Sequence, residues 1–80
     1  MAKNRPRDGT DPGLARFGRN VRRARQRAGL SQETLAILAQ ISQGEISVIE
    51  GGRREPGVLS LVALARALHV DPCDLLKGVN

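Results

Sequence analysis

The sequence predicts a single all-α domain of five short helices. Four stretches carry apolar residues at steps of three and four, which is the period of a helix face, and capping residues predict a fifth, shorter helix. Capping and stop residues separate these stretches: Ser31, Ser42 and Asp71 suit helix starts, and Gly29 and Gly51 suit helix ends. No stretch is predicted to be a strand, and the 80 residues suffice for one small domain.

The chain is expected to begin with a flexible basic arm at residues 1–13. Pro6, Gly9, Pro12 and Gly13 interrupt helix formation there. The arm is either a disordered tail or a cationic segment that contacts phosphate or a minor groove on binding. The folded domain is expected at residues 14–77, with residues 78–80 as a short tail.

The first helix is predicted over residues 14–28. One apolar stripe runs along it, and Gly29 stops it; the stripe comprises Leu14, Phe17, Val21, Ala24 and Ala28. Arg25 lies beside this stripe, so part of its side chain should be covered. Because an unpaired buried charge is costly, Arg25 is expected to have an acidic partner.

The stretch from Ser31 to Gly52 is predicted to form two short helices around a tight break. Ser31 caps the first of them, and Ser42 with Glu45 forms an S-x-x-E capping box for the second. Gln40 lies where the break needs a left-handed residue, at a cost of about 1 kcal/mol relative to glycine. Glu50 falls on the inward face of the second helix, which makes it the natural partner of Arg25.

The C-terminal part is predicted to contain a helix at about 58–68 and a last short helix after Asp71. Pro72 suits the first position of that last helix, and Asp74 its third. The 58–68 helix is apolar nearly all round, so something is expected to cover it. We therefore predict a dimer interface there, made by Leu59, Val62, Leu75 and Leu76. The alternative is a monomer whose last helix folds back on the core.

The charge of the chain favours a polyanionic partner. The formal net charge is +5, and the first 30 residues hold nine Lys or Arg against two Asp. A codon bias towards arginine is the alternative explanation. Phe17 is the only aromatic residue, which disfavours a single-strand binding protein that stacks bases on several aromatic rings.

Catalysis and membrane insertion are poorly supported. One His, one Cys and no Tyr leave few catalytic groups, and no metal-ligand spacing appears. We expect no enzyme activity, no metal and no cofactor. No signal peptide or long apolar run is present, so we expect a soluble, cytoplasmic protein without a membrane partner.

Double-stranded DNA is the partner that the side chains favour. The outward start of the helix after Ser42 is predicted to contact bases, because Gln43 can pair with adenine in the major groove and its small neighbours permit close approach. The base-contacting set is Gln43, Gly44, Ser47 and Val48. Phosphate contacts are predicted for Gln32, Ser42, Arg53, Arg54 and Arg16.

The strings LSQETLA, ISQGEISVIEGGRREP and LVALARALHVDPCDLL resemble the lambda-repressor-like helix-turn-helix domains of the Cro/repressor (Xre) class. The resemblance covers residues 14–76 and implies a five-helix domain whose second and third helices form the helix-turn-helix. It implies operator binding as a two-fold dimer, with Gln32 supporting the start of the third helix and an Arg25–Glu50 pair.

This sequence departs from the family pattern at several positions. Gln40 replaces the usual turn glycine, and apolar residues stand at places that are usually polar; these are Ile37, Leu38, Leu59 and Ala63. The functional prediction is a repressor of a palindromic operator that acts as a homodimer. The alternative is an antitoxin or regulatory subunit that binds a protein through its second and fourth helices.

Overall fold

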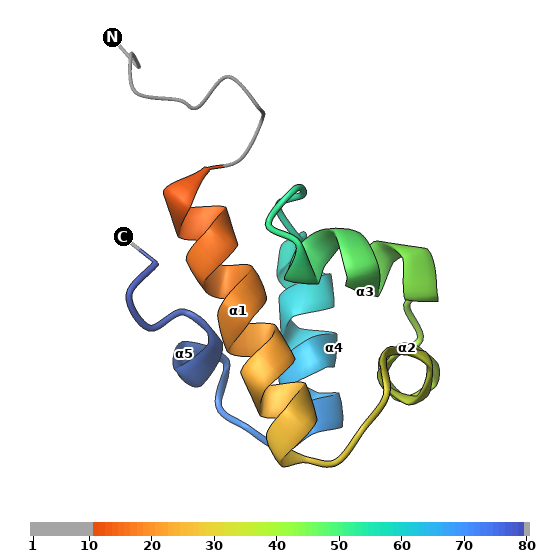
Figure 1. Cartoon of the computed structure of the whole chain (residues 1–80). Helices are drawn as coiled ribbons and strands as arrows, with labels where there is room; N and C mark the ends of the chain where they lie inside the picture. Colours follow the sequence, from red (N-terminus) through yellow and green to blue (C-terminus); the bar gives the residue numbers. More distant parts are fainter. Residues whose placement is uncertain (1–10, 80) are drawn as a thin grey trace, which may run out of the picture.

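The computed structural model describes residues 11–79, and these residues form five helices (Figure 1). The helices are α1 (Pro12–Arg27), α2 (Gln32–Ala39), α3 (Gln43–Glu50), α4 (Val58–Leu68) and α5 (Pro72–Leu75). The described range contains no strand, so the predicted all-α, five-helix class is confirmed. Residues 1–10 of the predicted arm and residue 80 of the predicted tail lie outside this range, whereas Val79 of that tail packs against the core.

Helix α1 begins at Pro12, two residues earlier than the predicted start at Leu14. Asp11 caps it, since its Oδ1 accepts from the Gly13 N–H at 2.8 Å and from the Leu14 N–H at 3.3 Å. Proline suits the first helical position because the N–H it lacks would have no partner within the helix. Pro12 and Gly13, which the sequence placed in the arm, thus belong to the helix.

The core lies between α1, α2, α3 and α4 and is closed by α5. Its largest fully buried side chains come from all five helices; they are Leu35, Ile46, Ile49, Leu64, Leu75 and Val21. Helix α1 packs against α3 and also against α5, and Figure 1 shows these two helices on opposite sides of it. The two flanks of α1 therefore face different parts of the protein.

Four helices end with the same backbone closure. In each, an N–H two or three residues beyond the helix donates to the carbonyl five residues before it, as in the Leu30 N–H to Arg25 O and Ile41 N–H to Ala36 O bonds, both 3.0 Å. The closing residue is left-handed each time, and only two of the four are glycine; they are Gly29, Gln40, Gly52 and His69. Gln40 has φ 59°, so the prediction of a left-handed, non-glycine turn is confirmed.

None of the helices within residues 11–79 has the length and apolar character needed to cross a membrane.

Candidate nucleic-acid interface

Helices α2 and α3 stand as a pair joined by the three-residue break at Gln40–Ser42 (Figure 1). The Ser31 Oγ accepts from the Thr34 N–H at 3.0 Å, and the Ser42 Oγ accepts from the Glu45 N–H at 3.1 Å. Each serine thus satisfies a free amide of a helix start. Glu45 completes the expected box only in part, because its carboxylate accepts from the Arg54 guanidinium at 3.0 Å.

The outward face of α3 is made of small or flexible polar residues. Gln43, Gly44 and Ser47 are exposed, and Val48 is half-buried at the edge of this face. A Cβ added at Gly44 would meet no heavy atom within 4 Å, so nothing in the protein crowds this point. The predicted base-contacting set therefore lies together on one accessible surface, while Ile46 and Ile49 of the same helix are fully buried.

Glu50 anchors the far end of α3 to α1. Its side chain is 0% exposed, and Arg25 donates to it twice, from Nε to Oε2 at 2.7 Å and from Nη2 to Oε1 at 3.0 Å. Arg22 Nε lies 3.4 Å from Oε1. Arg25 Nη1 also donates to the Leu30 carbonyl at 2.9 Å, which joins the loop before α2 to the same cluster. The pair expected from helical spacing is thus present, with Arg22 as an additional partner.

The pKa values in this cluster favour the charged forms. Burial is the largest influence on Glu50 and by itself would raise its pKa, but the hydrogen bonds from Arg25, Gln32 and Arg22 and the charge of Arg25 outweigh it and lower the pKa. The hydrogen bond to Glu50 raises the pKa of Arg25. The two residues therefore remain ionised at neutral pH and fix the orientation of α3 on α1.

Gln32 has a different role from the implied one. Its Nε2 donates to Glu50 Oε1 at 3.1 Å, so the side chain supports the C-terminal end of α3 rather than its start. The reason is geometric, since the first turn of α2 lies beside the end of α3 that carries Glu50. The backbone amides at the start of α2 still point out of the helix, as the first amides of a helix do, and such amides suit an anion.

The two arginines that follow α3 differ in their contacts. Both are exposed. Arg54 is held by Glu45, whereas no carboxylate of the described residues lies within 4.0 Å of the Arg53 side chain. The sequence did not predict the Glu45–Arg54 contact, because the two residues are joined by the Gly51–Gly52 turn and share no helical period.

Arg16 lies apart from the α3 surface. Its Nε donates to the Lys77 carbonyl at 3.3 Å, on the flank of α1 that faces the C-terminal segment. The flank that faces α3 is instead occupied by Gly18, Arg22 and Arg25. The structure therefore does not bring Arg16 together with the other predicted phosphate contacts.

An apolar surface covers the start of α4 and the C-terminal segment. Leu59 is 83% exposed, and Val62 and Leu76 are exposed as predicted. Val58, which the sequence did not single out, is also exposed and lines a hollow of about 240 Å³ with Leu76. The expectation that Leu75 lacks cover is wrong, because it is 1% exposed and packs in the core as the anchor of α5.

Comparisons with known proteins agree with this geometry. Residues 16–76 match a family described as a helix-turn-helix domain. The uncharacterized HTH-type transcriptional regulator y4dJ of Sinorhizobium fredii is 41% identical over 63 residues, which are 79% of this chain and 82% of that protein.

Two solved structures have a similar fold. The restriction-modification controller protein C.AhdI of Aeromonas hydrophila has a TM-score of 0.76 and 37% identity, over 78% of this chain and 94% of its own. The P22 c2 repressor, solved in complex with a synthetic operator, has a TM-score of 0.73 and 34% identity, over the same shares of the two chains. The lambda-repressor-like fold is thereby confirmed, and the family is one of regulators rather than enzymes. The chain belongs to the helix-turn-helix family of DNA-binding transcriptional regulators, in its Cro/C1 (Xre) class.

Proposed function

We propose that this protein is a sequence-specific repressor that places α3 in the major groove of a palindromic operator. The observation that carries the proposal is the outward surface of α3, where exposed Gln43, Gly44 and Ser47 lie next to one another without a crowding side chain. An amide side chain beside small residues suits close approach to base edges, because a glutamine can bond adenine N6 and N7 together.

The surroundings of α3 support contacts to the DNA backbone on both sides of the groove. Ser42 and the free amides at the starts of α2 and α3 suit phosphates, as helix N-termini commonly do. Arg53 is exposed just beyond α3 and has no carboxylate partner among the described residues, so it is the stronger of the two arginine candidates. The ion-pair cluster around Glu50 anchors α3 to α1, and it does not contact DNA in this proposal.

Dimerisation is proposed to occur through the apolar surface of α4 and the C-terminal segment. Val58, Leu59, Val62 and Leu76 are exposed there, and apolar side chains in a contiguous group commonly mark an interface. A two-fold pair of domains would present two α3 helices to successive major grooves about 34–36 Å apart.

A second candidate function rests on α2. Ile37 is 71% exposed and Leu38 is also exposed, which is unusual for a helix next to a DNA-reading helix. An antitoxin or regulatory subunit that binds another protein through α2 and α4 would use such residues. If the protein enriches no DNA sequence from a random pool, that result would favour this second function.

Selection of bound sites from random duplex DNA, followed by sequencing, tests the proposal. Two inverted half-sites with centres about 10 base pairs apart are expected, together with a dimer in sedimentation. On the selected site, Gln43→Ala should lose about 1–3 kcal/mol of binding free energy, and on random DNA very little.

Gln26→Ala is the matched control, because Gln26 is an exposed glutamine of α1 rather than of the helix-turn-helix pair. It should bind both DNAs as the wild type does. Equal losses for Gln43→Ala on selected and random DNA would show that Gln43 contacts only the backbone.

A further inference from the structure

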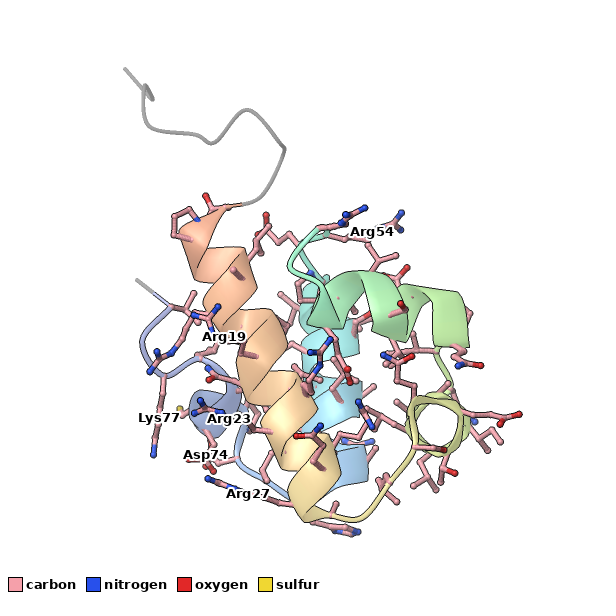
Figure 2. All side chains as sticks on the ribbon, viewed as in Figure 1. Arg19, Arg23, Arg27, Arg54, Asp74 and Lys77 are labelled. Carbon is pink, nitrogen blue, oxygen red and sulfur yellow. The ribbon has the colours of Figure 1, made fainter. Side chains whose placement is uncertain are left out.

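A row of arginines runs along the side of α1 that faces away from α3. Arg16, Arg19, Arg23 and Arg27 follow one another at steps of three and four residues, so they are neighbours on one helix face. The row is about 16 Å long, at 1.5 Å per residue. Figure 2 shows Arg19, Arg23 and Arg27 along this side, with Lys77 of the C-terminal segment near them.

The row borders a groove of about 650 Å³ between α1 and the C-terminal segment, lined by Arg16, Arg23 and Arg27 on one side and by Asp74 and Lys77 on the other. Specific contacts join the two sides of the groove. The Asn20 amide donates to the Leu75 and Lys77 carbonyls, both at 2.9 Å, and Arg16 donates to the Lys77 carbonyl as well. The position of Lys77 beside the row is therefore fixed by the fold.

Very little negative charge balances this face. Asp74 is the one acid among the groove-lining residues, and it already interacts with Lys77 at 3.6 Å and with the Asp71 N–H. Among residues 11–79, no carboxylate lies within 4.0 Å of the Arg19, Arg23 or Arg27 side chains. Arginines four residues apart repel one another and weaken the helix, whereas an ordinary solvated helix face mixes both signs.

We propose that this arginine row is a second nucleic-acid site, which binds the phosphate backbone of a duplex other than the one that α3 reads. Arginine forks match phosphate oxygens, and the straight 16 Å row is as long as about five base pairs of duplex axis at 3.4 Å each. Base stacking has no part in it, because Phe17, the only aromatic residue, is buried.

The position of the row favours a separate duplex. Helices α3 and α5 lie on opposite sides of α1, and the row runs along the α5 side (Figures 1 and 2). A straight duplex in contact with α3 does not pass along this flank. One domain would therefore join two DNA segments, a property that goes beyond operator reading and does not depend on which sequence α3 recognises.

A bridging assay tests this proposal with duplexes of random sequence. A bead-bound duplex of about 24 base pairs is saturated with protein, washed, and exposed to a fluorescent duplex of the same length and unrelated sequence. The wild type should capture the second duplex. With the triple variant Arg19→Gln/Arg23→Gln/Arg27→Gln, the amount of second duplex captured should fall about tenfold. Its affinity for a single duplex should change by less than about threefold.

One control accompanies the triple variant. Arg66→Gln removes an exposed arginine of α4 outside the row, and it should keep full capture of the second duplex. Circular dichroism should show that the triple variant is folded and at least as stable as the wild type, because the like-charge repulsion is removed.

Several results would overturn the proposal. They are absence of capture by the wild type, or unchanged capture by the triple variant. A fall of the salt slope for single-duplex binding by about 2.7, which is three contacts at 0.9 each, would place the arginines on the same duplex as α3. Displacement of the second duplex by a poly-glutamate chain at lower concentration than by unlabelled duplex would identify an acidic protein segment as the partner instead.

Discussion

Substitution of Arg25 by alanine removes the guanidinium that neutralises a carboxylate with no solvent exposure. Glu50 would keep Gln32 at 3.1 Å and Arg22 at 3.4 Å, but it would lose both short bonds to Arg25. Removal of one partner of a buried ion pair costs about 3–5 kcal/mol. Because Arg22 is half-exposed and can offset part of that loss, we expect Arg25→Ala to destabilise the fold by about 3 kcal/mol.

This loss is large for so small a domain. A chain of 80 residues has a free energy of unfolding of about 4–12 kcal/mol. A loss of about 3 kcal/mol should lower the melting temperature by about 12–24 °C. Urea unfolding followed by circular dichroism at pH 7 measures it, and the slope of the transition should stay unchanged.

The pH dependence separates a buried pair from a lost packing contact. The pKa of Glu50 is lowered in the folded protein, so its contribution to stability is complete above the unfolded value of about 4.3 and is lost as the pH falls through the folded value. In Arg25→Ala, burial should instead raise the pKa of Glu50, so protonation would relieve the variant. The difference between the two proteins should therefore be largest near neutral pH and shrink below about pH 4.

Arg19→Ala is the matched control, because it removes an exposed arginine of the same helix that has no carboxylate partner among the described residues. It should change stability by less than about 0.5 kcal/mol. A loss below about 0.5 kcal/mol for Arg25→Ala, or a loss that is independent of pH, would refute the buried ion pair.

Two further predictions concern the backbone, and urea unfolding measures both. Gln40→Gly should stabilise the fold by up to about 1 kcal/mol, because φ 59° suits glycine. By contrast, Gln26→Gly in the last turn of α1 should cost up to about 1 kcal/mol; a destabilised Gln40→Gly would contradict the strain. Gly18→Ala should cost at least about 1–3 kcal/mol, because its Cβ would lie 2.5 Å from the Glu50 carbonyl oxygen and 2.6 Å from that of Ile49. Gly44→Ala meets open space and should gain about 0.5–1 kcal/mol, so similar effects at the two glycines would disprove this packing argument.

Local rules predicted the helices because their signals lie within a few residues. Ser31, Ser42 and Asp71 cap helices as expected, and the left-handed turn at Gln40 follows from its place between two periodic stretches. The predicted start of α1, at Leu14, is two residues too late. Proline by itself predicts a break in a helix, whereas Asp11 as the cap before it makes Pro12 a favourable first residue.

The sequence alone also determined which residues of α3 face outward and which face inward, because the helical period places them on opposite faces. It likewise showed that Arg25 needs an acidic partner, because the same period places Arg25 beside the apolar stripe of α1. Only the tertiary structure decided which long-range partners meet. It brought Gln32 and Arg22 to Glu50, Arg54 to Glu45, and Arg16 to the Lys77 carbonyl, and it buried Leu75 under the core. Such contacts depend on the angles at which helices cross, and no spacing along the chain encodes those angles.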